Sequence, residues 1–373
     1  MKQMTGTSRY LSVNGTEVKS PVFLASMAGI TDAAYVLSRK ESVGGAFIGG
    51  YSIDDPTIAA SKEMEGCGRK EFTATLDDIA AELDSLKGQG LVIGVNLRGT
   101  TPEAYLAAAK RFGTDCIIEI DAHCRQKPMN RAGAGEVLLA DIPRLCAIVS
   151  ALHAAGYCVS VKFRAGIADD RDLAAVLWKA GADILHVDLM DFGHAKLRQI
   201  RNSCPLVIIG NNGVTSPDVM MDYFSHGADL VSLARGAHPD LLADLSAYSA
   251  EMAETVGWYN APKQVCRGGD WRGLAFCCMP IKQCPLLPTL SAIGMEYQEY
   301  VDLKMQAVAG TPLEPGNSTC FGSLAYCCKS STPCMFRDMS LMEAGLSKPE
   351  YMRLKRGLSQ AIMQKIFAGD RKP

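Results

Sequence analysis

The chain has 373 residues, of which 48% are hydrophobic and 21% charged, and its formal net charge is −2 at pH 7. These values exclude wholesale disorder and argue against a generally basic nucleic-acid binder. The length is sufficient for a domain of roughly 250 residues together with a second unit.

The hydropathy of the chain indicates no membrane association. No stretch reaches 18 consecutive apolar residues, which is the length that a spanning helix requires. The first twenty residues lack the long apolar segment of a secretory signal. We therefore expect a cytoplasmic protein that does not bind membranes.

Eight short apolar runs alternate with amphipathic segments over the first two thirds of the chain. The runs are 22–27, 45–49, 91–97, 115–121, 158–164, 183–189, 206–211 and 229–234. Near-continuous apolar runs are typical of parallel strands that are covered on both faces. Eight near-equal strand–helix units predict an α/β fold of the (β/α)₈ TIM barrel type, with a doubly wound sheet as the alternative.

The cysteines divide the chain into two parts. Eight of the 14 cysteines lie in residues 257–373, a segment that contains none of the six histidines. Without an export signal, such a cysteine array indicates metal binding or catalysis rather than disulfides. We predict a barrel over residues 1–256 and a cysteine-rich, mainly helical and loop-containing metal domain over residues 257–373.

The strand ends of a TIM barrel carry its chemistry, and two of the predicted ends here are rich in glycine. The seventh run leads into Gly210-Asn211-Asn212-Gly213 and the eighth into Ala234-Arg235-Gly236. Glycines allow backbone N–H groups to approach an anion, although they also serve ordinary turns. Two such loops on neighbouring strands favour a ligand that carries phosphate.

Several motifs in this region resemble the dihydrouridine synthase family, whose barrel is itself similar to dihydroorotate dehydrogenase. The motifs are PVFLASMAGITDAAY (21–35), VNLRG (95–99), EIDAHCRQKPMNRAGAGEVLL (119–139), VKFRAG (161–166) and LVIIGNNGV followed by GADLVSLARGA (206–237). The resemblance implies FMN at the mouth of the barrel. It implies that the following residues bind the cofactor: Ala25, Ser26 and Met27 beside the flavin ring, Asn96 and Lys162 at its polar edge, and Gly213, Arg235 and Gly236 at the phosphate. We add the strand-end residues Arg164 and Asn211 to this predicted set.

Two residues are candidates for catalysis, Cys124 and Lys162. The resemblance places Cys124 at the cysteine that serves the family as a proton donor, and a thiol of ordinary pKa is protonated at neutral pH. The family pattern is interrupted around it by Asp121, His123 and Arg125. A neighbouring arginine could lower the thiol pKa and favour a nucleophile or a metal ligand instead. Lys162 ends an apolar strand and would stabilise reduced flavin.

The cysteine-rich part is an imperfect duplication, in which GLAFCCMPIKQCP corresponds to SLAYCCKSSTPCM. The predicted metal ligands are Cys266, Cys277, Cys278, Cys284, Cys320, Cys327, Cys328 and Cys334. All-thiolate ligation suits iron–sulfur clusters or zinc. Because Cys-Cys-x₅-Cys is not a usual zinc spacing, we expect one or two [4Fe–4S] clusters, with zinc as the alternative.

The same tail resembles the methanogenesis marker protein 9 family, which joins such a domain to a dihydrouridine synthase-like barrel. The segments that carry this resemblance are CRGGDWRGLAFCCMPIKQCPL, TCFGSLAYCCKSSTPCMFRD and LSKPEYMRLKRGLS. The resemblance implies an anaerobic methanogen and a role tied to methanogenesis, without specifying a reaction.

Three functions are compatible with these observations. The first is an FMN-dependent reductase that receives electrons through the cysteine-rich domain from a donor protein. Its substrate would be an anionic small molecule or RNA phosphate docking near Arg125, Lys127 and Arg131. The second is a maturation or assembly factor that binds a methanogenesis protein. The third is a reductase of RNA like the tRNA dihydrouridine synthases.

Overall fold

The computed structural model describes residues 9–190, 192–262, 270–277, 284–314, 323–328 and 333–367. The chain separates into two units. One is Tyr10–Ser249, and the other comprises the described residues from Ala250 onward together with Arg9. Among the described residues, no helix is both long and apolar enough to cross a membrane.

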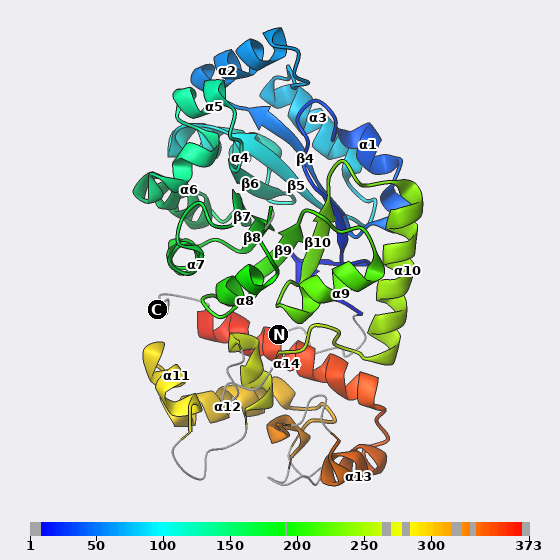
Figure 1. Ribbon diagram of the computed structural model, residues 1–373. Helices are drawn as coiled ribbons and strands as arrows, with labels where there is room; N and C mark the ends of the chain where they lie inside the picture. The colour runs from blue at the N-terminus through cyan, green and yellow to red at the C-terminus, as the bar shows by residue number, and fades with distance from the viewer. Residues whose placement is uncertain are drawn as a thin grey trace. The chain divides into compact units, whose positions relative to one another are not determined.

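The first unit is built around a closed barrel of parallel strands, which confirms the predicted TIM barrel (Figure 1). The strands are β3 (Val22–Leu24), β4 (Gly45–Ser52), β5 (Val92–Arg98), β6 (Ile117–Ala122), β7 (Val159–Arg164), β8 (Ile184–Asp188), β9 (Val207–Asn211) and β10 (Leu230–Leu233). Each strand pairs with the next along the chain, and β10 closes the barrel by pairing with β3. A short hairpin, β1 (Ser12–Val13) and β2 (Thr16–Glu17), precedes them.

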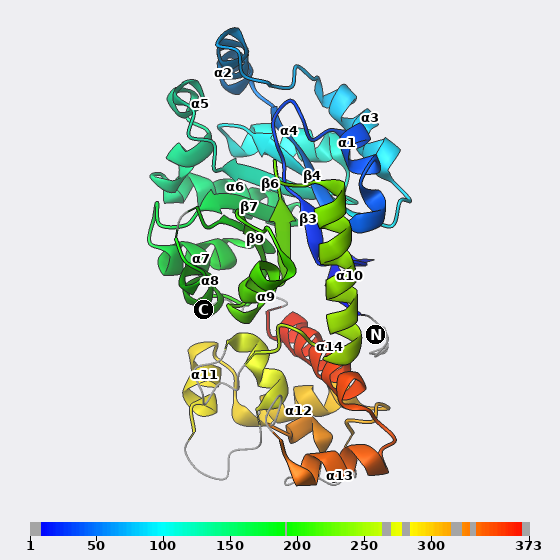
Figure 2. The same cartoon turned by 45° about the vertical axis from the view of Figure 1, so that its right-hand side comes forward.

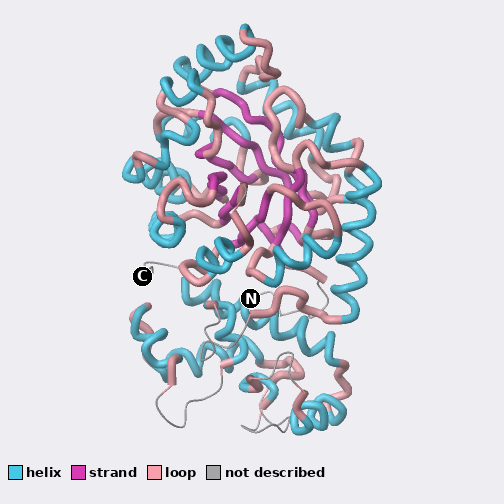
Figure 3. Tube along the Cα trace, viewed as in Figure 1, coloured by secondary structure: helices cyan, strands magenta, loops and turns pink. Residues whose placement is uncertain are grey.

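Helices follow the strands and surround the barrel, as Figures 2 and 3 show. They are α1 (Ala33–Leu37), α2 (Asp55–Gly66), α3 (Leu76–Leu86), α4 (Pro102–Phe112), α5 (Lys127–Ala132), α6 (Ile142–Ala154), α7 (Asp170–Ala180), α8 (Ala195–Arg201), α9 (Pro217–Ser225) and α10 (Pro239–Thr255). Many begin at a side chain that satisfies a free backbone donor. Ser216, for example, accepts a hydrogen bond from the N–H of Val219 and precedes a proline at the first helical position.

The strands are apolar because both of their faces are covered. Every residue of β4 and β6 is buried, and β5 is buried except for Ile93.

One buried cation also stabilises the barrel. Arg201 is 2% exposed and ion-paired with Asp229, and it donates hydrogen bonds to the carbonyls of Gly227 (2.9 Å) and Leu206 (2.7 Å).

The second unit is helical, with no strand among its described residues (Figure 3). Its elements are the 3₁₀ helices η4 (Trp271–Phe276) and η5 (Leu324–Tyr326) and the α-helices α11 (Leu286–Ala292), α12 (Tyr297–Val308), α13 (Met335–Glu343) and α14 (Lys348–Phe367). This agrees with the predicted helical and loop character of the tail.

The duplication that the cysteine segments indicate extends through the whole second unit. Each repeat has a 3₁₀ helix that ends at a cysteine, then a short helix, a glycine with φ of +65°, and a longer helix. The glycines are Gly294 and Gly345. The longer helices carry matching sequences, EYVDLK at 299–304 and EYMRLK at 350–355. The 3₁₀ helices of the two repeats contact each other, and α12 contacts η5 while α14 contacts η4.

The buried Arg201 ion pair provides a test of the barrel packing. Replacing Arg201 with Met leaves Asp229 buried without its cation, and we expect the free energy of unfolding to fall by about 3–5 kcal/mol. Urea denaturation followed by circular dichroism measures this loss. Arg198→Met is the matched control, since Arg198 is exposed on the same helix, and it should cost less than about 1 kcal/mol. Equal losses in the two variants would contradict this assignment.

Candidate functional site

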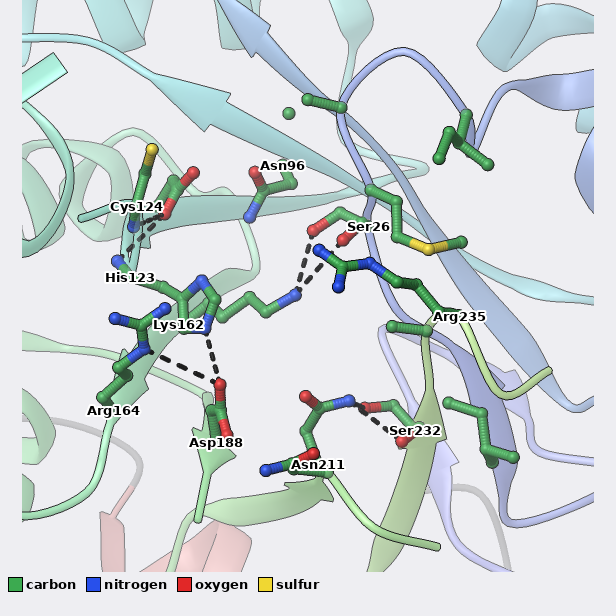
Figure 4. Close-up of a pocket in the computed structure, with 18 of the residues that line it drawn as sticks. Ser26, Asn96, His123, Cys124, Lys162, Arg164, Asp188, Asn211, Ser232 and Arg235 are labelled. Atoms are coloured by element: carbon green, nitrogen blue, oxygen red, sulfur yellow. Dashed lines mark hydrogen bonds and ion pairs between the residues drawn. The ribbon is translucent and has the colours of Figure 1, made fainter. Parts of the chain in front are cut away.

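A cavity of about 950 Å³ opens at the carboxyl ends of the barrel strands (Figure 4). Its lining includes these residues from the predicted set: Ser26, Met27, Asn96, Cys124, Lys162, Arg164, Asn211, Gly213, Arg235 and Gly236. Ala25 does not line the cavity. It is fully buried, and its N–H donates to the carbonyl of Leu233 (2.8 Å). The strand register therefore brings together residues that are far apart in the sequence.

The floor of the cavity rests on a chain of buried polar side chains. Glu119 on β6 accepts hydrogen bonds from Asn96 (2.8 Å) and Ser160 (3.0 Å) and pairs with His186 Nδ1 (2.8 Å). The other ring nitrogen of His186 lies 2.7 Å from the hydroxyl of Ser232. The amide of Asn211 donates to the same hydroxyl (2.8 Å). The chain thus connects six neighbouring strands, β5 to β10, across the inside of the barrel.

The protonation states of Glu119 and His186 follow from this chain. Burial alone would raise the pKa of Glu119, but the interactions with His186, Lys162 and Asn96 outweigh it and hold the pKa below its usual value. Burial lowers the pKa of His186 and outweighs the attraction of Glu119. The pair is therefore a carboxylate that accepts the Nδ1 proton of a neutral imidazole, whose Nε2 accepts from Ser232.

Lys162 lies one step above this chain, on β7. Its side chain is 4% exposed, and Nζ donates to the hydroxyl of Ser26 (3.1 Å) and contacts the Ser26 carbonyl (3.5 Å). Figure 4 shows the side chain extending across the cavity from β7 toward Ser26 at the end of β3. An ammonium in this position presents one fixed positive charge to a ligand in the cavity.

Cys124 lines the cavity from the loop after β6, where it also packs against Met64 and Met129. Burial, and then the charge of Asp121, raise the pKa of its thiol, and the opposing effect of Arg98 is smaller. The predicted alternative of a lowered thiol pKa is therefore wrong, and the thiol holds its proton at neutral pH. Asp121 also fixes the loop, because it accepts hydrogen bonds from the N–H groups of His123 and Cys124, both at 2.9 Å.

Arg98 and Asp188 organise the rim on either side of Asp121. Arg98 is 6% exposed and pairs with Glu71 (2.6 Å) and Asp121 (3.1 Å). Asp188 contacts His123 Nε2 at 2.7 Å. Burial alone would raise the pKa of Asp188, but the hydrogen bonds from His123 and from the N–H of Met190, together with the nearby positive charge, outweigh it and lower the pKa. Asp121, His123 and Asp188 thus form one connected network.

The two glycine loops leave donors available to a ligand. The backbone N–H groups of Gly213 and Gly236 donate no hydrogen bond among the described residues, and both glycines line the cavity. A Cβ at either position would meet nothing within 4 Å. Arg235 is exposed, and within the described part of the chain it forms no ion pair (Figure 4). Together these groups could hold a phosphate.

The charge of the lining is strongly positive. Its cations are Arg69, Lys70, Arg98, Arg125, Lys162, Arg164 and Arg235, and its carboxylates are Asp121 and Asp188. Lys127 and Arg131, which we expected near the substrate, do not line the cavity, and Arg131 pairs instead with Glu63 (2.6 Å). An anionic ligand is therefore favoured.

Sequence inspection missed Arg98, Glu119, His186 and Ser232 as parts of the site. A signal for all four was present, because each lies two residues before or after a predicted site residue on its strand or beside one across the ladder. Side chains two apart on a strand share a face, so polar residues at these positions of an apolar strand point into the barrel.

A second candidate site lies in the cysteine-rich unit. Five of the predicted ligands are described, namely Cys277, Cys284, Cys327, Cys328 and Cys334, whereas Cys266, Cys278 and Cys320 lie outside the described residues. Cys277 and Cys327 are buried and occupy the same position in the two repeats, each at the end of its 3₁₀ helix. Their use as ligands stays a prediction.

Two fully buried lysines accompany these cysteines. Lys304 donates to the carbonyls of Cys277 (2.7 Å) and Leu274 (3.2 Å), and Lys355 donates to those of Ala275 (2.9 Å) and Ala325 (2.7 Å). Burial and the charge of Lys304 lower the pKa of Lys355, whereas the thiols of the nearby cysteines raise it.

Comparison with known proteins agrees with the fold. The sequence profile described as dihydrouridine synthase (Dus) matches residues 70–264. An uncharacterized protein of Methanocaldococcus jannaschii is 30% identical over 57% of this chain and 88% of its own length. The tRNA-dihydrouridine synthase B of Xanthomonas axonopodis pv. citri is 26% identical over 61% of this chain and 68% of its own length.

Among solved structures, DHODH from Eimeria tenella in complex with ferulenol superimposes with a TM-score of 0.53. It is 15% identical and covers 68% of this chain and 86% of that chain, which supports the barrel fold alone. Fold and cavity thus define a TIM barrel with a cationic, phosphate-compatible mouth. The chain belongs to the dihydrouridine synthase family.

The raised pKa of Cys124 can be tested by chemical modification. We expect Asp121→Asn to remove a negative charge beside the thiol and to lower its pKa, so that alkylation of Cys124 becomes faster at a given pH. Iodoacetamide labelling across a pH series, quantified on the Cys124 peptide by mass spectrometry, measures this. Asp172→Asn, at an exposed position on α7, is the control. A profile that moves to higher pH, or not at all, would contradict the electrostatic assignment.

Proposed function

We propose that this protein is an FMN-dependent reductase whose cysteine-rich unit carries a metal–thiolate centre, a [4Fe–4S] cluster in preference to zinc. The observation that carries the proposal is the convergence of Lys162, Cys124 and two open glycine loops on one cavity. Membership of the dihydrouridine synthase family supports a reductive role for such a cavity.

The residues present fit FMN. Donors for a phosphate come from two sources. The N–H groups of Gly213 and Gly236 donate no hydrogen bond among the described residues, and the guanidinium of Arg235 forms no ion pair with any of them. Asn96 and Lys162 line the same cavity, where they would provide a hydrogen bond and a positive charge to the flavin ring. When bound, FMN would supply the hydride that a reduction requires.

The chain's own side chains would perform the remaining tasks. Lys162, fixed by Ser26, would balance negative charge on the reduced cofactor. Cys124 would hold the proton for the substrate, because burial keeps its thiol protonated. The excess of cations at the mouth would attract and orient an anionic substrate.

A role in methanogenesis is part of this proposal. It is supported by the resemblance of the tail to the methanogenesis marker protein 9 family and by the relative in Methanocaldococcus jannaschii. An anaerobic cytoplasm would also protect an exposed cluster and many thiols from oxidation. The cluster would pass electrons from a donor protein to the flavin.

A second candidate function is reduction of uridine in tRNA. It is favoured by the similarity to tRNA-dihydrouridine synthase B and by the cationic rim, which suits a phosphate backbone. Mass spectrometry of tRNA nucleosides from a strain lacking the gene distinguishes the two. Loss of dihydrouridine would establish the RNA substrate, and unchanged dihydrouridine would exclude it.

The proposed cofactor can be tested on anaerobically purified protein. We expect about one releasable FMN per chain, measured by absorbance and chromatography after acid denaturation. Arg235→Ala should weaken FMN binding by about 10- to 100-fold, because it removes a charge-assisted phosphate contact. Arg171→Ala, at an exposed position on α7, is the control. Protein that neither retains nor rebinds FMN would refute the proposal.

Lys162 should affect the cofactor differently from Arg235. Lys162→Met removes the positive charge beside the ring but no predicted phosphate contact. We expect it to lower the flavin reduction potential more than it weakens FMN binding, as measured by anaerobic redox titration and fluorescence titration. A potential equal to that of the wild type would contradict the assigned role.

A further inference from the structure

Each of the two buried lysines of the cysteine-rich unit contacts both repeats. Lys355 belongs to the second repeat, but its Nζ donates to a carbonyl of each repeat, Ala275 (2.9 Å) and Ala325 (2.7 Å). It also lies 5.4 Å from the centre of the Phe276 ring in the first repeat. Lys304 of the first repeat lies 5.0 Å from the centre of the Tyr326 ring in the second.

The tyrosines on the same helices form equivalent contacts, each within its own repeat. The hydroxyl of Tyr300 donates to the carbonyl of Cys277 (3.3 Å), and that of Tyr351 donates to the carbonyl of Cys327 (3.4 Å). Phe276 and Tyr326 directly precede these cysteines. The two halves are therefore related as an approximate two-fold pair, with Lys355 between the ends of their 3₁₀ helices.

The position of Lys355 is electrostatically unusual. Its side chain is 0% exposed, and no carboxylate among the described residues lies within ion-pairing distance of it. A buried ammonium without an anion is costly, and the neighbouring charge of Lys304 adds to that cost. Its carbonyl partners Ala275 and Ala325 each lie two residues before a buried cysteine, Cys277 in the first repeat and Cys327 in the second.

We propose that the two repeats jointly hold one thiolate-ligated metal centre and that Lys355 is its counter-cation. This inference rests on the proposed metal-binding function of the unit and specifies how the site is built. Zinc bound by four thiolates and a [4Fe–4S] cluster in its oxidised state with four thiolates both carry a net charge of about −2. A single buried cation bonded to carbonyls of both repeats fits one centre that the repeats share better than a separate centre in each repeat.

The number of centres is tested with equivalent cysteines. Cys284 and Cys334 occupy the same position in the two repeats, after Cys-Cys and five residues. In a shared centre, Cys284→Ser and Cys334→Ser should each reduce the iron, sulfide or zinc content of the whole chain by at least about fivefold. In separate centres, each variant would retain half of the wild-type content. Retention of half would overturn the inference while leaving the metal-binding function intact.

The counter-cation role is tested with Lys355→Met, Lys355→Arg and the control Lys365→Met, which changes an exposed lysine on the same helix. We expect Lys355→Met to weaken metal retention against a chelator by about tenfold or more, and Lys355→Arg to keep it within about threefold of the wild type. If the centre is a cluster, Lys355→Met should also make its reduction potential more negative, because a cation that favours the added electron is lost.

A purely structural role for Lys355 gives a different result. In metal-free protein, Lys355→Met should unfold at the same temperature as the wild type or higher, since an uncompensated buried amine has been removed. In metal-loaded protein, it should unfold at a lower temperature. Destabilisation of both forms with unchanged metal affinity would contradict the counter-cation role. Wild-type protein that binds no metal after anaerobic purification would refute the proposed metal function itself.

Discussion

The barrel site depends on the hydrogen bonds that the buried carboxylate of Glu119 accepts from neighbouring strands. It is completely buried, and a buried charge is tolerated only where hydrogen bonds and opposite charge compensate for its lost hydration. Asn96, Ser160 and His186 supply those hydrogen bonds from the neighbouring strands, and Lys162 supplies the charge. The same contacts fix the orientation of the side chains from which the cavity floor is built.

A similar constraint governs the cysteine-rich unit with the sign reversed. There the buried group is the amine of Lys355, whose hydrogen bonds go to carbonyl oxygens, which carry only partial negative charge. Thiolates bound to a metal would provide an anion beside it. Both units thus concentrate buried charge beside the groups to which we assign chemistry, as is common at functional sites.

The sequence was sufficient to predict the barrel because the eight strands are mostly apolar, and each of the predicted runs contains an observed strand or overlaps one. Ten of the 11 residues predicted to bind the cofactor or to act in catalysis line the cavity, since the strand ends and glycine loops follow from that periodicity. The pairing of Arg98 with Glu71 could not be foreseen, because Glu71 lies in a loop whose course depends on tertiary packing. The buried lysines were missed for another reason, as Lys304 and Lys355 lie in amphipathic helical sequences that are usually read as having solvated lysines.

The proposed function requires the loops after β9 and β10 to bind the phosphate of FMN at the barrel mouth. Hydrogen–deuterium exchange of the protein with and without FMN measures this most directly, because a bound phosphate must engage the backbone N–H groups of Gly213 and Gly236. We predict that peptides covering 212–215 and 234–237 become protected when FMN is added. Unchanged exchange in both peptides at saturating FMN would contradict the account.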